Sequence, residues 1–335
     1  MESGNGSSDT YEELIPSRKV QFWTILMFKI PSLACTIYLL HQFLWHKYLR
    51  HPLHNHILII LLFFVFIVEV IDNPLYLDGY LHRGRSSFPS SPAVCLLWLF
   101  IDYGVYGAIT VFLTWASFER HLLAFHYTQF MGTRLKRILF HYIPLGLLLI
   151  YITGFYIGVI VFPPCKNTFD YELEVCGMSP CYQDVSWLNI WDYFVHGTIC
   201  TIIEAILSVS LLIRIIWKRR HVQRLVHWKK HRKMIMQLLS ITTLSLSITL
   251  PQTLIAAIQE MVPGMDDFSA GISPYFYYLT SYVVLLLPFV MLVSSQELWP
   301  KFIRSQKHRY RAVGPLAMVH LNGHSLTVQP RTIVY

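Results

Sequence analysis

The residues best suited to chemistry lie in one long apolar run, 93–126. This run contains Asp102 and, 18 residues later, Arg120 within the triplet Glu119-Arg120-His121. At 3.6 residues per turn, that spacing is five turns and about 27 Å, so Asp102 and Arg120 are expected on one face of a helix. The separation is close to the roughly 30 Å of a bilayer's hydrocarbon core. We therefore expect a rod with an acidic site near one membrane surface and an arginine site near the other.

The surroundings of Asp102 suggest what it could bind. Two aromatic residues lie near it in the same run, and two more lie in the last apolar run: Trp98, Tyr106, Tyr278 and Tyr282. A carboxylate between aromatic rings suits a cation, through charge pairing and cation–π contact. The alternative is an internal partner, such as Lys29 or a tyrosine hydroxyl. Four other acids are expected to make packing contacts or to lie at the rim: Glu69, Asp72, Asp192 and Glu204.

Seven apolar runs would position these residues. The chain of 335 residues is 54% hydrophobic and only 14% charged, and its mean hydropathy is +0.44. Soluble domains carry about 25% charged residues. The runs are 20–45, 56–77, 93–126, 138–161, 190–216, 234–258 and 274–295. Their length and lack of alternating polarity predict helices rather than membrane strands. The expected fold is an all-α, seven-transmembrane helix bundle.

The segments outside the bundle complete the predicted organisation. Residues 1–19 form an extracellular segment ahead of the receptor-sized domain 20–295. A cytoplasmic amphipathic helix is expected at 296–306, followed by a flexible cytoplasmic tail at 307–335. Residues 1–19 lack an apolar core and a small-residue cleavage site, so we do not expect a cleaved signal peptide.

The distribution of positive charge predicts orientation. With the N-terminus outside, 20 of the 27 Lys and Arg residues fall in the inner segments, as the positive-inside rule requires. This layout accounts for the net charge of +8 without a nucleic-acid partner. We expect a multi-pass protein of the plasma membrane that contacts membrane lipids.

The cysteines agree with this topology. Cys95 lies at the predicted outer mouth of the third run, and three more lie in one outer connector: Cys165, Cys176 and Cys181. An oxidising exterior favours disulfides there, and four cysteines allow three pairings. Asn5 begins an Asn-Gly-Ser sequon for glycosylation.

The sequence does not favour an enzyme. The histidines at 51, 54 and 56 are dense but have no second cluster, and a structural metal site needs about four placed ligands. No phosphate-binding loop, Gly-x-Ser-x-Gly or Cys-x-x-Cys motif is present. No metal or cofactor is therefore expected.

Taken together, these features resemble a divergent rhodopsin-like (class A) G-protein-coupled receptor, similar to invertebrate orphan receptors. Glu119-Arg120-His121 resembles the family's Asp/Glu-Arg-Tyr triplet, and Cys95 precedes Arg120 by the family's 25 residues. Pro251 resembles the proline of the sixth span, and Pro288 that of a degraded seventh-span Asn-Pro-x-x-Tyr. The resemblance covers about residues 20–306.

The resemblance implies a function. An extracellular ligand, cationic or peptide, would bind near Asp102, and the sixth span would swing outward on a hinge near Pro251. Arg120, paired with Glu119 at rest, would then be uncovered to a heterotrimeric G protein. It also implies that Cys95 bonds to the second outer loop. We expect Cys95–Cys176 with Cys165–Cys181; Cys95–Cys181 is the alternative.

Departures from the family pattern keep two other functions open. The first run has no Asn, the second has no acid at its centre, and Leu287 and Met291 replace the Asn and Tyr of the seventh. A receptor-like scaffold that no longer couples is one alternative. A transporter or channel is the other, although no internal repeat relates the two halves of the chain.

Overall fold

The computed structural model describes residues 16–82, 91–171, 174–177, 180–221, 226–261 and 266–294. Over these ranges the regular structure is entirely helical, with no strand. Seven helical segments are long and apolar enough to cross a membrane, and we number them as the first to seventh spans: Arg18–Trp45, Leu53–Leu81, Pro92–Phe125, Arg134–Val161, Ser186–Trp217, Ile235–Ile258 and Tyr275–Ser294. The predicted all-α, seven-span fold is confirmed, and every predicted end lies within a few residues of the observed one.

The spans are built from the following helices. The first is α2 (Arg18–Trp45), and the second joins α4 (Leu53–Ile67), η1 (Val68–Asp72) and α5 (Asn73–Leu81). The third joins α6 (Pro92–Leu99), η2 (Phe100–Val105) and α7 (Tyr106–Phe125). The fourth joins α9 (Arg134–Arg137), η3 (Ile138–Tyr142), α10 (Ile143–Tyr156) and η4 (Ile157–Val161). The fifth joins α11 (Ser186–Ile190), η7 (Trp191–Ile199) and α12 (Cys200–His221); α13 (Val226–Met261) and α14 (Asp266–Ser294) contain the last two.

Four spans depart from the plain α-helix that the sequence predicts. The segments η1, η2, η3, η4 and η7 are π-helical. A π turn widens the helix and is found frequently at functional sites. Six ionisable residues of the spans lie in these segments: Glu69, Asp72, Asp102, His141, Asp192 and His196.

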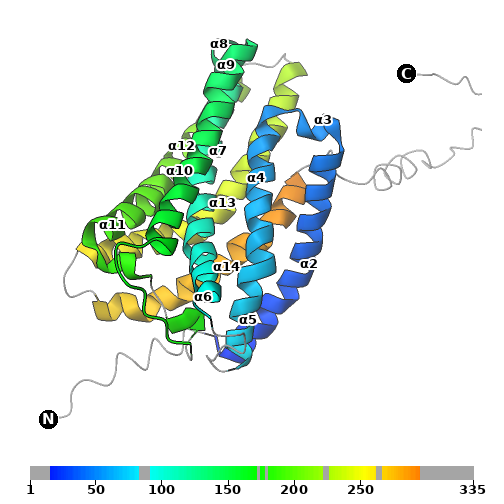
Figure 1. Cartoon of the computed structure of the whole chain (residues 1–335). Coiled ribbons are helices and arrows are strands. Elements are labelled where there is room, and N and C mark those ends of the chain that lie inside the picture. The colour runs from blue at the N-terminus through cyan, green and yellow to red at the C-terminus, as the bar shows by residue number, and fades with distance from the viewer. Residues whose placement is uncertain are drawn as a thin grey trace, which may run out of the picture. The chain divides into compact units, whose positions relative to one another are not determined.

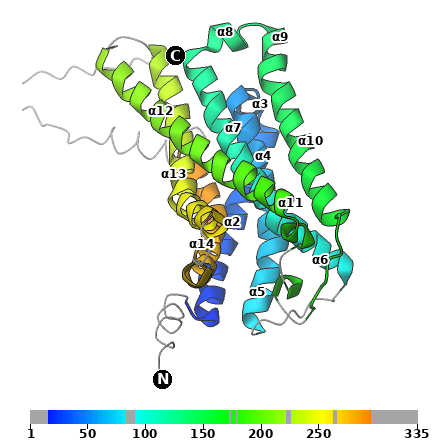
Figure 2. The ribbon, with the colours of Figure 1, turned by 90° about the vertical axis from the view of Figure 1, so that its left-hand side faces the viewer.

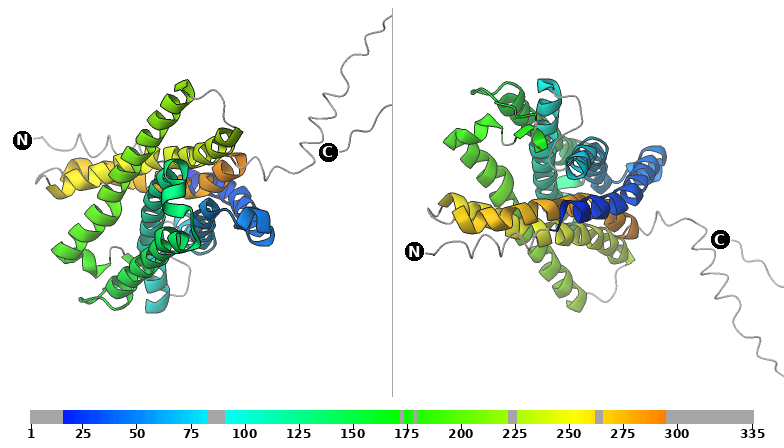
Figure 3. Two further views of the ribbon diagram at one scale, coloured as in Figure 1. Left: turned by 90° about the horizontal axis from the view of Figure 1, so that it is seen from above. Right: turned by 90° about the horizontal axis from the view of Figure 1, so that it is seen from below.

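The third span is the centre of the bundle. Its helix α7 contacts α4, α10, α12 and α13, and Figure 2 shows α7 between α10 and the crossing α12. The short helices α3 (Lys47–Arg50) and α8 (Tyr127–Met131) lie with α9 toward the upper end in Figure 1, opposite α5 and α6. Seen from above, α13 and α14 run side by side and obliquely to the other spans (Figure 3), and α14 also packs on α2.

Burial follows the membrane environment. Leu61, Phe112 and Leu113 are fully buried at the centre, whereas large apolar side chains such as Met27 and Ile150 are more than 70% exposed. Such exposure is unfavourable in water but natural against lipid. The protein is therefore a multi-pass membrane protein. All described residues belong to the compact unit Met1–Gln296; the expected sequon at Asn5, helix 296–306 and tail 307–335 lie outside the described residues.

Candidate functional site

Asp72 and Asp102 form the core of one polar cluster between the second and third spans. The indole of Trp98 donates to Asp72 over 2.9 Å, and the hydroxyl of Tyr106 donates to its other oxygen over 3.4 Å. The hydroxyl of Tyr76 donates to Asp102 over 2.9 Å. We call these five residues the aspartate cluster. The third span therefore presents its predicted acid to a second acid rather than to a base.

The two acids of this cluster have different environments. Asp72 has no exposed surface, and both of its oxygens accept hydrogen bonds. Asp102 is only half-buried, and Tyr76 is its one hydrogen-bond donor within the described ranges. Asp72 thus orients Trp98 and Tyr106, while Asp102 keeps acceptor capacity for a cation. Tyr76 was missed by the sequence analysis, although it follows Asp72 by one helical turn and so lies on the same face.

Two predicted partners of Asp102 lie elsewhere. The hydroxyls of Tyr278 and Tyr282 are 2.5 Å apart, and Tyr278 is also 2.8 Å from the Thr24 hydroxyl of the first span. Their assignment to the Asp102 site is wrong, because this face of α14 packs against α2. Tyr277, one residue earlier and therefore turned about 100° away, is the tyrosine within electrostatic range of Asp102.

Lys29 does not neutralise Asp102 either. It lies within electrostatic range of Glu69, which is fully buried and accepts a hydrogen bond from Ser32. Ser32 also donates to the carbonyl of Leu285 over 2.7 Å. Glu69 thus joins the first, second and seventh spans in a packing contact of the kind expected for it.

The other end of the third span carries a second polar group, which we call the histidine cluster: His56, Glu119, Arg120 and His141. A carboxylate oxygen of Glu119 lies 2.6 Å from Nδ1 of His141, and Nε2 of His141 lies 2.9 Å from Nδ1 of His56. Glu119 and His141 are at most 1% exposed. A continuous hydrogen-bonded chain therefore joins the second, third and fourth spans.

Three consecutive residues of α7 reach three different spans. Glu119 faces His141 of the fourth span, and Arg120 donates to the carbonyl of His54 in the second over 3.0 Å. The ring of His121 lies 2.9 Å from the carbonyl of Leu207 in the fifth. Successive residues of an α-helix turn by about 100°, which distributes the triplet around the rod.

The expected resting ion pair between Glu119 and Arg120 is not formed. Adjacent residues of a helix do not face each other, so Glu119 pairs with His141 of the fourth span instead. One oxygen of Glu119 and one terminal nitrogen of Arg120 are buried without a hydrogen-bond partner in the described structure. His141 stands alone in the sequence, and no local signal identifies it as the partner.

The two prolines lie within unbroken helices. Pro251 is inside α13 and Pro288 inside α14. Beside Pro251, the side-chain oxygen of Gln252 accepts a hydrogen bond from Thr280 over 2.7 Å. This bond joins the sixth and seventh spans at the position expected to act as a hinge.

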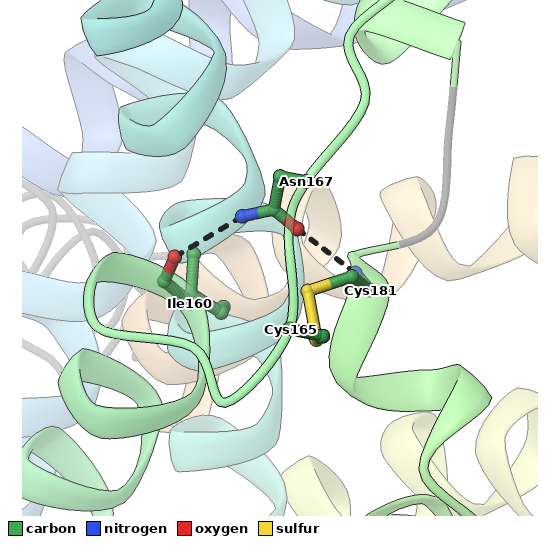
Figure 4. Close-up of a disulfide and its surroundings, with 4 residues drawn as sticks. All are labelled: Ile160, Cys165, Asn167 and Cys181. Atoms are coloured by element: carbon green, nitrogen blue, oxygen red, sulfur yellow. Dashed lines mark hydrogen bonds between the residues drawn. A yellow bond between two sulfur atoms is a disulfide. The ribbon is translucent and has the colours of Figure 1, made fainter.

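The cysteines pair as predicted after the resemblance was drawn. Cys95 is bonded to Cys176, and Cys165 to Cys181. Figure 4 shows the second disulfide with Asn167, whose amide donates to the carbonyl of Ile160 and accepts from the backbone N–H of Cys181. The connector is thus tied to the ends of the third and fourth spans.

Next to Cys181, Tyr182 reaches from the connector into the bundle. Its hydroxyl donates to Asp192 over 2.7 Å, and the hydroxyl of Tyr156 donates to the same carboxylate over 2.7 Å. His196 completes the site, 3.0 Å from Asp192. Burial, and then the nearby charge of Asp192, raise the pKa of Tyr182 far above its usual range, so this hydroxyl stays a proton donor. The network fixes the connector to the fourth and fifth spans.

No protein-family model matches this chain. No curated protein matches it either. Within the described ranges, no group of three or more His, Cys, Asp or Glu is arranged to hold a metal ion. The chemistry on offer is therefore that of the two polar clusters: one acid open to a cation, and one closed chain of buried acid and histidines.

Proposed function

We propose that the protein is a receptor that binds an extracellular ligand beside Asp102 and activates a heterotrimeric G protein from the opposite end of the third span. The observation that carries this proposal is the placement of both clusters on one central helix. One cluster retains a half-exposed carboxylate, and the other ties together the spans around Arg120. The resemblance to rhodopsin-like receptors supplies the orientation, with the N-terminus outside the plasma membrane.

The ligand chemistry follows from the aspartate cluster. Asp102 offers charge and an unfilled acceptor, and Trp98 and Tyr76 hold their rings edge to face beside it, with centroids 5.5 Å apart. An ammonium or guanidinium group of an amine or basic peptide would pair with Asp102 and lie against these aromatic rings. Asp72, already satisfied, would keep Trp98 in position.

Coupling would act through the histidine cluster. Ligand binding changes the receptor only if it favours one arrangement of the spans over another. In the proposed mechanism, the sixth span moves outward near Pro251, which removes one helix hydrogen bond, and the Thr280–Gln252 bond breaks or re-forms. Arg120, held by the His54 carbonyl, would then exchange that acceptor for a group on the G protein.

Recruitment of fluorescent engineered G proteins at the cell surface tests the proposal. Cells would be challenged with monoamines, basic peptides and fractionated tissue extract, with surface expression measured in the same cells. We expect an agonist response that Arg120→Ala abolishes at equal surface expression. Asp102→Asn should raise the agonist concentration for half-maximal response at least tenfold, because the charge pair is lost. Phe118→Ala, at a 40% exposed site one residue before the triplet, is the matched control.

The same assay distinguishes the alternatives. An agonist-dependent current or flux that survives Arg120→Ala would contradict the receptor proposal and favour a transporter or channel. A specific ligand that binds at Asp102 yet recruits no G-protein class would favour the non-coupling scaffold.

A further inference from the structure

A cavity of about 550 Å³ opens between the second, third and fourth spans, apart from both polar clusters. We call it the 2-3-4 groove. Its walls are formed by aromatic and aliphatic side chains, including Phe63 of the second span, Phe100 of the third and Ile150 of the fourth. Its volume falls within the range of small-molecule sites, about 300–1,000 Å³. No charged residue lines it.

The groove is continuous with the lipid-facing surface of the bundle. Phe63 is 54% exposed and Ile150 is 72% exposed, and both lie well inside membrane-crossing segments. Water in such a groove would have almost no polar partners. The medium that reaches it is the bilayer interior, so its occupant must be a membrane lipid or a part of one.

Two glycines shape the groove. A Cβ atom on Gly104 would lie 3.2 Å from side-chain atoms of Tyr156, so this glycine allows the third and fourth spans to approach closely at the floor. A Cβ atom on Gly154 would meet no atom within 4 Å. The space above Gly154 is therefore open, and a larger side chain there would fill the groove without striking the protein.

One polar group faces this apolar space. Thr153 lines the groove, and its hydroxyl has no hydrogen-bond partner in the described part of the chain. The other hydroxyl in the lining, that of Tyr156, already donates to Asp192. A hydroxyl left without a partner in hydrocarbon is costly, so the preferred occupant brings one polar group of its own.

We propose that the 2-3-4 groove binds a sterol from the bilayer. The flat, rigid ring system of a sterol would lie against the phenyl rings of Phe63 and Phe100, and its single hydroxyl would exchange a hydrogen bond with Thr153. A rigid ligand loses little conformational entropy on binding. An acyl chain would lose more and would leave the Thr153 hydroxyl without a partner.

Photolabelling tests this site on the full-length protein in nanodiscs, without reference to signalling. The probe is a clickable, photoreactive cholesterol, and labelled peptides are located by mass spectrometry. We expect labelling within residues 149–156 that unlabelled cholesterol competes away. Gly154→Leu should reduce it at least tenfold, and Thr153→Val should weaken apparent affinity about fivefold, the effect of one lost hydrogen bond.

Gly146→Leu is the matched control. Gly146 lies in the same helix and also has no atom within 4 Å of its Cβ position, but it does not line the groove, so labelling should be unchanged. Equal labelling of the Gly154→Leu and Gly146→Leu proteins would overturn the proposal. So would a photoreactive phospholipid that labels the groove as strongly and is not displaced by cholesterol, because the occupant would then be an acyl chain.

Discussion

The aspartate cluster and the histidine cluster lie on the same helix but are built differently. In the histidine cluster the acid is buried, and it is bonded to an equally buried imidazole over 2.6 Å. In the aspartate cluster the buried acid, Asp72, is satisfied by an indole and a phenol, while Asp102 remains half-exposed. One cluster joins three spans through a closed chain of hydrogen bonds; the other joins two and leaves an acceptor open.

This difference teaches that burial, rather than residue type, separates holding from binding. A buried carboxylate removed from its partner leaves an uncompensated charge, so such a pair resists change. A half-exposed carboxylate costs less to leave open and can accept a ligand. The comparison predicts that substitutions in the histidine cluster affect folding most, whereas Asp102 affects binding most.

The largest expected effect is that of breaking the buried pair. His141→Phe should lower the free energy of unfolding by about 3–5 kcal/mol, because Glu119 would remain buried without its partner. Denaturant unfolding of the detergent-solubilised protein measures this. The double variant with Glu119→Gln should recover part of the loss. His126→Phe, at an exposed position, is the control, and a loss equal to that of His141→Phe would contradict the assignment.

A smaller loss is expected from the satisfied acid of the other cluster. Asp72→Asn keeps the shape but weakens two hydrogen bonds to a charged acceptor, at a cost of about 1.5–3 kcal/mol. The same unfolding experiment measures the change, and fluorescence of Trp98 against a Trp98→Phe background reports its altered environment. An unchanged spectrum would show that Asp72 does not position this indole.

Asp102→Asn should cost less in stability, about 1 kcal/mol, since the acid is half-exposed and Tyr76 can still donate to the amide oxygen. Its effect should instead fall on ligand binding, measured by displacement of a labelled cationic agonist from membranes. A large stability loss with normal binding would reverse the comparison between Asp72 and Asp102.

The smallest effect is expected from Tyr282→Phe. This change removes one hydroxyl from the contact between the first and seventh spans and should cost about 0.5 kcal/mol. Because Tyr282 lies away from Asp102, agonist affinity should stay within twofold of the wild type. A tenfold loss of affinity would return Tyr282 to the ligand site.

Most of the fold was predictable from the sequence. Seven long apolar runs identify the spans, because backbone groups in hydrocarbon must bond within their own helix. The even turn of the helix also places Asp102 and Arg120 on the face toward the second span, where they contact Tyr76 and the His54 carbonyl. With the resemblance, the cysteine positions predicted both disulfides of the structure.

Only the tertiary structure determined which polar side chains meet. Glu119 is followed directly by a base, yet its partner is His141, 22 residues away on another span. Tyr278 and Tyr282 face the first span, whereas the expectation placed them beside Asp102. A helical period fixes the direction of a side chain around its own axis. The rotation and crossing of neighbouring helices, and the π turns within them, decide what that side chain contacts.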